Sequence, residues 1–189
     1  MTATLLFMNT ILPSVSDKSI VMIGLMGAGK SSIGRRLADA LDLEFVDTDD
    51  EIVKAAGCSI ADIFEIYGEQ AFRDLEERVI ERLIHEPRRV IATGGGAYMH
   101  PDTRERIDET TVTVWLRADL DILVERTGRR GGRPLLEQGD PREILKSLID
   151  KRYPVYAGAD IVIDTSPDGH DITVQQIVSA LQEYIKAST

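Results

Sequence analysis

Residues 24–32, with the sequence GLMGAGKSS, constrain the fold of this chain more than any other segment. They match the spacing Gly-x-x-x-x-Gly-Lys-Ser, in which glycines let several backbone N–H groups approach one phosphate and the lysine adds a positive charge. An apolar run at 20–23 precedes the motif, and helical spacing of Ile33 and Leu37 follows it. Because the loop amides and a helix N-terminus must point at the same anion, the motif belongs between a strand and a helix. The sequence therefore predicts a phosphate-binding loop, whereas an ordinary glycine-rich turn would match this spacing only by chance.

This loop supplies the predicted nucleotide ligands. Lys30 is expected to reach the β and γ phosphates, and the Ser31 hydroxyl is expected to bind Mg²⁺. The predicted nucleotide-binding residues of the loop are Gly27, Ala28, Gly29, Lys30, Ser31 and Ser32.

Further short apolar segments follow the loop, and helical patterns separate them. The predicted strands are 20–23, 44–47, 89–92, 111–116 and 161–163, and the predicted helices are 49–56, one capped by Ser59, 69–84, 101–107, 119–127, 141–156 and 172–185. Pro154 is expected to end or bend the helix in which it lies. The alternation predicts an α/β fold with a five-stranded, mostly parallel sheet covered by helices on both faces. Ligands of such a sheet bind beyond the carboxyl ends of its strands.

The composition is that of a globular protein, with 189 residues of which 43% are apolar and 29% charged. Acidic residues outnumber basic ones by 32 to 22, which gives a formal net charge of -10. This negative charge disfavours general binding to nucleic acid or to an anionic membrane, so neither is an expected partner. The one cysteine, Cys58, excludes an internal disulfide and agrees with a cytoplasmic location.

The N-terminal segment 1–17 is rich in apolar residues but contains no Lys or Arg before residue 18. It therefore lacks the charged start of a secretory signal, and its apolar run is too short to span a bilayer. We expect 1–17 to be an N-terminal extension and 18–189 to form a single domain. The expected oligomeric state is a monomer.

Two acidic residues and one arginine are candidate catalytic or binding groups. Asp47 and Asp49 lie two positions apart at the end of a predicted strand, so one carboxylate can face a metal ion while the other faces an acceptor hydroxyl. Alternatively, Asp49 only caps the following helix. Arg73 precedes Glu76 by one helical turn, an arrangement that could orient the guanidinium toward a ligand carboxylate. The alternative for this pair is an exposed ion pair of little energetic weight.

Residues 126–133 contain four arginines and three glycines. An RNA-binding loop is disfavoured because the segment is short, lacks interleaved aromatic residues and belongs to an acidic chain. A lid over a nucleotide suits the composition better, since glycines permit movement and arginines meet phosphate charge on closure. We predict a mobile lid at about 126–140, with the contributions of Arg129 and Arg130 left open.

Together these motifs resemble the shikimate kinase family, small P-loop kinases that transfer the γ-phosphoryl group of ATP to the 3-hydroxyl of shikimate in aromatic amino-acid biosynthesis. The matching segments are GLMGAGKS at 24–31, DTD at 47–49, GEQAFRDLE at 68–76, TGGG at 93–96, RPLL at 133–136 and KRYPVY at 151–156. They follow the order and approximate spacing of the family. The resemblance implies a three-layer P-loop kinase fold with a lid, ATP as co-substrate, Mg²⁺ as cofactor and shikimate as acceptor.

The resemblance also implies roles for single residues. The implied catalytic residues are Lys30, Asp49 and Arg133. Asp47 would join Ser31 in the Mg²⁺ shell, and Arg126 would pack on the adenine. Residues 164–168 resemble the loop that borders the adenine. The implied shikimate-binding residues are Asp49, Phe64, Phe72, Arg73, Gly94, Gly95, Gly96 and Arg152.

One position departs from the broader P-loop pattern, because no aspartate ends the predicted strand 89–92. The carboxylate near the metal is therefore expected from Asp47. Two other functions stay open: a kinase of similar fold for another small molecule, such as gluconate, and a non-catalytic nucleotide-binding protein. A kinase for a neutral sugar would not need both Arg73 and Arg152, and a non-catalytic protein would not need Lys30 and Asp49.

Overall fold

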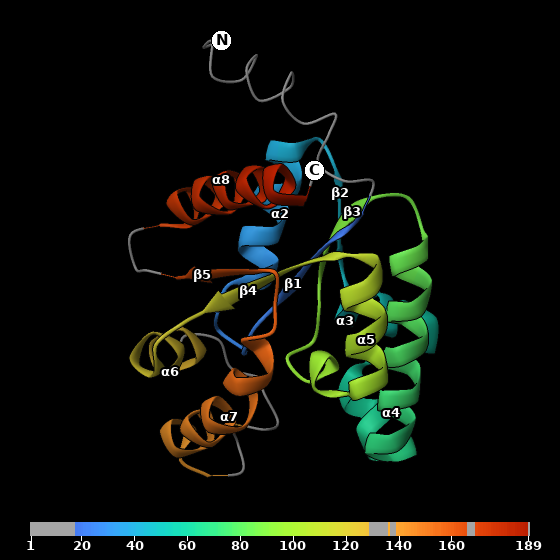
Figure 1. The fold of residues 1–189 in the computed structure, drawn as a ribbon. Coiled ribbons are helices and arrows are strands. Elements are labelled where there is room, and N and C mark those ends of the chain that lie inside the picture. The colour runs from blue at the N-terminus through green and yellow to red at the C-terminus, as the bar shows by residue number, and fades with distance from the viewer. Residues whose placement is uncertain (1–17, 129–135, 137–138, 166–168, 189) are drawn as a thin grey trace.

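Five parallel strands form one sheet in the order β2-β3-β1-β4-β5, with helices on both faces (Figure 1). The computed structural model describes residues 18–128, 136, 139–165 and 169–188. The strands are β1 (Ile20–Ile23), β2 (Glu44–Asp47), β3 (Arg89–Ala92), β4 (Val112–Arg117) and β5 (Ile161–Asp164). The helices are α2 (Lys30–Leu41), α3 (Thr48–Ala56), α4 (Ile60–His85), the 3₁₀ helix η2 (Ala97–Met99), α5 (Pro101–Thr110), α6 (Leu120–Gly128), α7 (Pro141–Tyr156) and α8 (His170–Ser188). The predicted α/β fold with a five-stranded parallel sheet is confirmed.

The sheet is built around β1, which pairs with β3 on one side and with β4 on the other. All four of its residues are buried, as expected for a strand covered on both faces. Helices α2 and α8 pack together on one face of the sheet, and α4 and α5 lie on the other (Figure 1). The carboxyl end of β1, where the phosphate loop begins, therefore lies between the ends of two neighbouring strands.

Two helices contain a residue that is unusual inside a helix. Helix α4 joins the predicted helix that starts after Ser59 to the one predicted at 69–84, and the two meet at Gly68, whose φ of 82° and ψ of 173° are not helical. Helix α7 has the predicted bounds of 141–156 and continues two residues beyond Pro154. Of the two expected effects of Pro154, ending the helix does not occur, because a proline in the last turn removes only one backbone donor from the helix. The last residue of α7, Tyr156, lies in the core with 0% of its surface exposed.

Several predicted features fall outside the described residues. These are the N-terminal extension at 1–17, most of the lid at 126–140, and residues 166–168 of the loop after β5. Within the described part of the chain, no helix combines the length and the apolar character that a membrane crossing requires.

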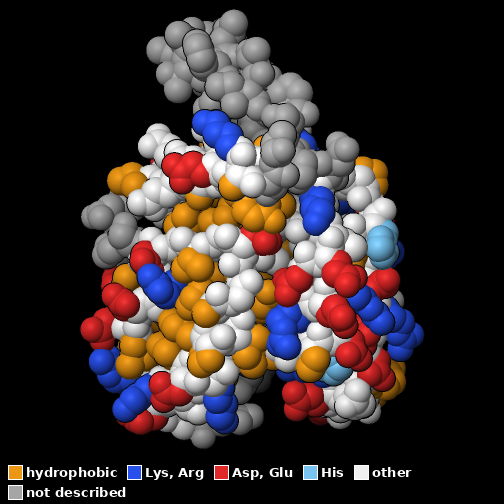
Figure 2. All heavy atoms as spheres, viewed as in Figure 1, with side chains coloured by type: hydrophobic (Ala, Val, Ile, Leu, Met, Phe, Trp, Pro, Cys, Tyr) orange, Lys and Arg blue, Asp and Glu red, His pale blue; other side chains and the backbone are white. Residues whose placement is uncertain are grey.

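The face shown in Figure 2 mixes acidic and basic side chains over α4 and α5. Arg106 of α5 contacts Glu77 and Glu81 of α4 at 3.0 and 3.1 Å. Exposed ion pairs contribute only about 0–1 kcal/mol each. The association of α4 with α5 therefore depends mainly on apolar side chains of the shared core, such as Val79 and Ile107.

Substitution of Gly24 should destabilise the fold at the start of the phosphate loop. Gly24 has a φ of +144°, and a Cβ atom there would lie 2.7 Å from the backbone carbonyl oxygen of Leu116. We expect Gly24→Ala to lower the free energy of unfolding by about 1–3 kcal/mol, measured by urea denaturation. Gly128→Ala is the control, because no heavy atom of the described residues lies within 4 Å of its Cβ position. Equal losses in both variants would contradict the strain at Gly24.

Candidate active site

The phosphate loop connects β1 to α2 and folds its lysine back over its own backbone. Lys30 Nζ donates to the carbonyl oxygens of Gly24 at 2.8 Å and Leu25 at 3.1 Å. Gly29, with a φ of 101°, is the N-cap of α2, so the positive end of the helix begins at the loop. The ammonium group and the helix N-terminus therefore lie together where the sequence predicts a bound phosphate.

Ser31 and Asp47, the two predicted metal ligands, are in direct contact. Ser31 Oγ donates to Asp47 Oδ2 at 2.6 Å, although the two residues belong to α2 and β2. A hydroxyl and a carboxylate are the oxygen ligands that suit Mg²⁺, and both lie beside the phosphate loop. The geometry of this pair therefore fits a magnesium site.

Asp47 also caps the helix that carries Asp49. Asp47 Oδ1 accepts a hydrogen bond from the Asp49 N–H at 3.1 Å, and Asp47 is the N-cap of α3. The alternative that Asp49 only caps this helix is therefore wrong. The Asp49 carboxylate remains available to another partner.

Asp49 has a raised pKa. Its side chain reaches solvent, yet the surrounding protein partly desolvates the carboxylate, and the charges of Asp47 and Glu76 add to this effect. Together they raise the pKa of Asp49 to about 6, with Lys30 opposing the shift. A carboxylate of this kind is ionised at neutral pH and is more basic than an ordinary aspartate, which suits a proton acceptor.

Gly94 separates two carboxylates at the end of β3. A Cβ atom on Gly94 would lie 2.6 Å from Glu76 Oε1 and 3.3 Å from Asp49 Oδ1. Its N–H donates to Thr48 Oγ1 at 3.1 Å, which ties the end of β3 to the start of α3. Any larger residue would displace one of these side chains, so the two carboxylates approach each other only across a glycine.

The predicted arginines Arg73 and Arg152 line one cavity, which we call the arginine pocket. It has a volume of about 470 Å³, and its lining includes Glu76, Gly96 and His100. Arg73 is on α4 and Arg152 is on α7, so the tertiary structure brings together two residues far apart in the sequence. Two guanidinium groups in one pocket can bind a carboxylate of a small ligand.

Both arginines are oriented by protein oxygens. Arg73 Nη1 donates to Glu76 Oε2 at 2.7 Å, and its Nη2 donates to Glu69 Oε1 at 3.2 Å. Arg152 Nη1 donates to the carbonyl oxygen of Gly95 at 2.5 Å. The interaction predicted between Arg73 and Glu76 is confirmed, and it is more than a surface ion pair because only 4% of the Glu76 side chain is exposed.

Burial raises the pKa of Glu76, whereas the charges of Arg73 and Arg152 oppose this shift. Glu76 and Asp49 therefore both have raised pKa values and lie on either side of Gly94. The negative charge of this region is high before any ligand binds. A cationic or metal-bound group nearby would be stabilised by it.

The remaining predicted residues lie around these two sites or outside the described chain. Phe64 and Phe72 pack against each other with ring centroids 4.7 Å apart, and Phe72 is the more buried. The Arg73 guanidinium lies over the Phe72 ring at 5.1 Å. Arg126 Nη1 lies 3.5 and 3.4 Å from the carbonyl oxygens of Gly27 and Ala28 of the phosphate loop. Arg133, Arg129 and Arg130 lie outside the described residues.

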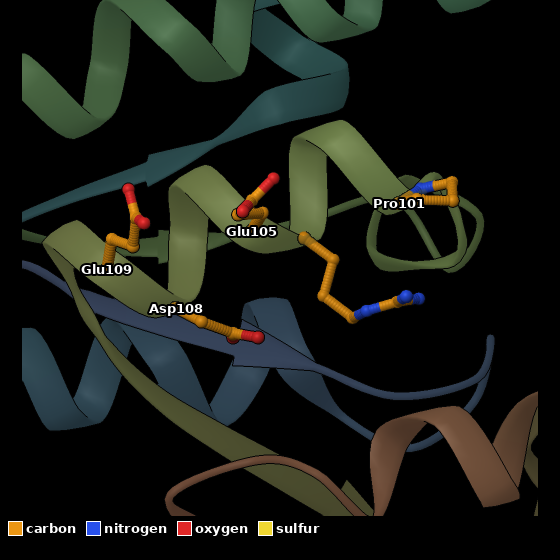
Figure 3. A pocket seen from close by; sticks show the side chains of 5 residues that line it. Pro101, Glu105, Asp108 and Glu109 are labelled. Atoms are coloured by element: carbon orange, nitrogen blue, oxygen red, sulfur yellow. The ribbon is translucent and has the colours of Figure 1, made fainter.

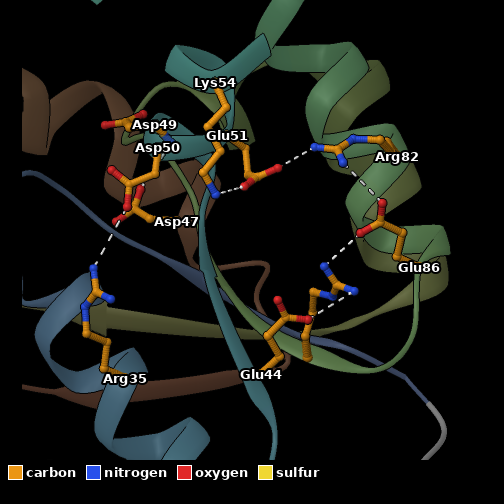
Figure 4. A network of polar contacts seen from close by, with 10 residues as sticks. Arg35, Glu44, Asp47, Asp49, Asp50, Glu51, Lys54, Arg82 and Glu86 are labelled. Carbon is orange, nitrogen blue, oxygen red and sulfur yellow. Dashed lines mark hydrogen bonds and ion pairs between the residues drawn. The ribbon is translucent and has the colours of Figure 1, made fainter.

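A network of ion pairs holds α3, and with it Asp49, against α4 (Figure 4). Glu51 of α3 accepts hydrogen bonds from Lys54 and from Arg82 of α4, both at 2.6 Å. Arg82 in turn contacts Glu86 at 3.2 Å, which contacts Arg89 at 2.7 Å. Each pair contributes little, but the connected set limits movement of α3 relative to α4.

A second hollow of about 490 Å³ runs along α5 (Figure 3). It is lined by Pro101, Arg104, Glu105, Asp108 and Glu109, which all belong to that one helix. Three of these five residues are acidic, and of the five only Pro101 also lines the arginine pocket. None of the charged residues of this hollow is therefore part of the predicted site.

Two groups of this region are absent from the sequence prediction. Thr48 holds Gly94, and the Tyr156 hydroxyl donates to the carbonyl oxygen of Gly95. Thr48 belongs to the DTD segment and Tyr156 to the KRYPVY segment, so their positions in these motifs were the only available signal. Their partners lie 46 and 61 residues away, and local sequence patterns carry no information on such contacts.

Comparisons with known proteins agree with this geometry. The Shikimate kinase family model matches residues 26–182. The shikimate kinase of Paramagnetospirillum magneticum (strain ATCC 700264 / AMB-1) is 52% identical over 168 residues, which cover 89% of this chain and 86% of that protein. A solved shikimate kinase from Acinetobacter baumannii, in complex with shikimate, has a TM-score of 0.86 and 34% identity, covering 92% of this chain and 97% of its own. A gluconokinase from Sinorhizobium meliloti 1021, with a TM-score of 0.63 and 18% identity over 90% of this chain and 95% of its own, shares the fold alone.

Replacement of Asp49 should stabilise the protein in a pH-dependent way. The pKa of Asp49 is raised from 3.8 to about 6 on folding, so its ionisation opposes folding above about pH 6 and has no such effect below 3.8. We expect Asp49→Asn to have a higher free energy of unfolding than the wild type at pH 8, with a smaller gain at pH 4.5.

Urea denaturation at several pH values measures this gain. Asp50→Asn is the control, because Asp50 is its exposed neighbour and pairs with Arg35 at 3.9 Å. A gain for Asp49→Asn that is independent of pH, or equal to that of Asp50→Asn, would contradict the raised pKa.

Proposed function

This chain belongs to the shikimate kinase family, and on that premise we propose that it transfers the γ-phosphoryl group of ATP to the 3-hydroxyl of shikimate. The products are shikimate 3-phosphate and ADP. The observation that carries the proposal is the position of Gly95 between the two halves of the site. A Cβ atom there would lie 3.1 Å from Arg152 Nη1, 3.4 Å from the Gly24 carbonyl oxygen and 3.8 Å from the Met26 nitrogen. The arginine pocket and the phosphate loop therefore meet across one glycine.

On the donor side, the phosphate loop binds the triphosphate of ATP. Its backbone amides and the N-terminus of α2 face the phosphates, and Lys30 adds a positive charge at the γ-phosphate. Ser31 and Asp47 would hold Mg²⁺, which would supply positive charge against the triphosphate. Arg126, which lies against Gly27 and Ala28, is placed to border the nucleotide.

On the acceptor side, Arg73 and Arg152 bind the carboxylate of shikimate. Because Arg73 is on α4 and Arg152 is on α7, the two guanidinium groups bind the carboxylate from two directions. This fixes the orientation of shikimate relative to the phosphate loop. Asp49, at the other side of Gly94 from Glu76, orients the 3-hydroxyl. Phe64 and Phe72 form the apolar wall of this half of the site, and the Gly95 N–H is the donor to the transferring group.

The transfer step needs alignment and charge stabilisation more than covalent participation by the protein. The 3-hydroxyl oxygen forms a bond to the γ-phosphorus while the bond from that phosphorus to the β,γ-bridging oxygen breaks, and ADP leaves with the electron pair. The hydroxyl proton passes to the Asp49 carboxylate, whose pKa of about 6 lets it accept and then release a proton near neutral pH. Lys30 and Arg133 stabilise the charge on the transferring group.

We also propose that 18–189 act as one domain with a lid at 126–140, in a cytoplasmic monomer. The described site residues all come from one chain, and they share one sheet and one apolar core. A second copy is therefore not needed to complete the described part of the site.

The function is tested by ADP release from the purified protein with a panel of acceptors. We expect ADP release with ATP, Mg²⁺ and shikimate, and little with quinate, gluconate or AMP. Asp49→Asn, purified identically, should retain ATP binding but lose most turnover, which excludes a contaminating kinase as the source of activity. Preference for any other acceptor would contradict the proposal.

Replacement of Arg73 by lysine tests the acceptor site. A lysine keeps the charge but cannot form two parallel hydrogen bonds to a carboxylate. We expect Arg73→Lys to raise the KM for shikimate roughly tenfold to a hundredfold, because one charge-assisted hydrogen bond is lost, and to change the KM for ATP little. Arg78→Lys is the control, because Arg78 is exposed on the same helix and donates only to the Asp74 carbonyl. Equal effects on both substrates would remove Arg73 from the acceptor site.

A further inference from the structure

Tyr156 is a buried residue of the KRYPVY segment for which the proposed reaction has no role so far. It is the last residue of α7 and has 0% of its surface exposed. Its ring lies in an aromatic cluster, with centroids 6.2 Å from Tyr98 and 5.9 Å from Trp115. Its hydroxyl donates to the carbonyl oxygen of Gly95. A residue this deeply buried cannot contact a ligand itself, but it can act on the loop that does.

The Gly95 carbonyl and the Gly96 N–H belong to the same peptide unit. No described peptide bond is cis, so in this unit the C=O and N–H groups point in opposite directions. Among the hydrogen bonds of the described residues, the carbonyl accepts from Tyr156 and Arg152, whereas none uses the Gly96 N–H. The two donors therefore set the orientation of a peptide whose opposite side carries a free N–H group.

Gly96 belongs to the arginine pocket, which it lines together with Arg73 and Arg152. A Cβ atom on Gly96 would lie 2.8 Å from Arg73 Nη1, so only a residue without a side chain fits between the backbone and this guanidinium group. An amide donor beside two guanidinium groups adds a third hydrogen-bond donor for the same carboxylate.

The Tyr156 hydroxyl is suited to this role because it stays protonated. Burial raises the pKa of Tyr156, and the nearby charge of Arg152 opposes the shift only in part. The hydroxyl is therefore protonated at neutral pH and can donate. Arg152 has several N–H groups and can donate both to the Gly95 carbonyl and to a ligand in the pocket. Tyr156 has one O–H group, which donates to the Gly95 carbonyl.

We propose that Tyr156 is a positioning residue of the acceptor site, which orients the 95–96 peptide so that the Gly96 N–H donates to the carboxylate of the acceptor. The inference rests on the proposed function, because that function supplies the carboxylate. It assigns to the aromatic cluster under the pocket a part in substrate binding as well as in packing.

Tyr153 offers a matched comparison within the same helix. Its hydroxyl also donates to a backbone carbonyl, that of Ala118 at 2.5 Å, and its ring packs on Trp115 at 4.9 Å between centroids. Ala118 follows β4 and is not part of the arginine pocket. Removing either hydroxyl costs one hydrogen bond to a carbonyl and leaves the ring in place, and for Tyr153 it also removes an acceptor that lies 3.4 Å from the Ala118 N–H. Only the Tyr156 hydroxyl contacts the 95–96 peptide.

The test compares Tyr156→Phe with Tyr153→Phe in steady-state kinetics and in NMR spectra of the ligand-free protein. We expect Tyr156→Phe to raise the KM for shikimate about threefold to tenfold, because one neutral hydrogen bond is lost, and to leave the KM for ATP unchanged. Tyr153→Phe should leave both KM values unchanged. The Gly95 carbonyl ¹³C and Gly96 amide ¹⁵N resonances should shift in Tyr156→Phe and stay in place in Tyr153→Phe. Thermal unfolding of each variant measures the loss of stability that both substitutions cause in the aromatic cluster.

The outcomes separate the inference from the function on which it rests. An active wild type in which Tyr156→Phe and Tyr153→Phe have the same KM for shikimate would overturn the positioning role alone. Unchanged Gly95 and Gly96 resonances in Tyr156→Phe would overturn it as well, without reference to activity. A wild type that does not phosphorylate shikimate would overturn the proposed function and this inference with it.

Discussion

The site depends on one constraint: at the carboxyl end of β3, the backbone must pass between charged side chains with no side chain of its own. Gly94 separates Glu76 from Asp49, Gly95 lies between Arg152 and the phosphate loop, and Gly96 lies beside Arg73 with no room for a side chain. Parallel strands bring their carboxyl ends to one edge, so this bare segment lies next to the loop that follows β1. The arginine pocket and the phosphate loop are therefore separated by a single backbone segment.

Electrostatics of the site follow from the same crowding. Asp47, Asp49 and Glu76 gather around Gly94, and partial desolvation together with mutual repulsion raises the pKa of Asp49. Such an arrangement opposes folding slightly but provides a carboxylate with the basicity that proton transfer needs near neutral pH. Lys30, Arg73 and Arg152 balance this charge from the loop and the pocket. The site is therefore prepared for anionic ligands and a divalent cation, although the whole chain carries a net charge of -10.

Rigid support of this edge comes from side chains to which the proposed function assigns no ligand contact. The ion-pair network from Lys54 to Arg89 connects α3 to α4, and the aromatic cluster of Trp115, Tyr153 and Tyr156 fills the space beneath α7. Precise placement of reacting groups requires that the residues holding them are themselves held by packing and hydrogen bonds. Tyr156 shows how a core residue can meet both needs, since its ring fills the core while its hydroxyl reaches the loop.

The sequence by itself determined the local features of this protein: the strand–loop–helix unit around Lys30, the order of strands and helices, and the candidate charged residues. These features depend on spacing within a few residues, which periodicity and glycine positions record directly. Resemblance to a family extended the prediction to Arg73 and Arg152. Only the tertiary structure decided that Asp47 rather than Asp49 caps α3, and that Tyr156 and Thr48 hold the glycine segment. The physical reason is that these contacts join residues distant in the chain, and their geometry is set by how the helices pack on the sheet.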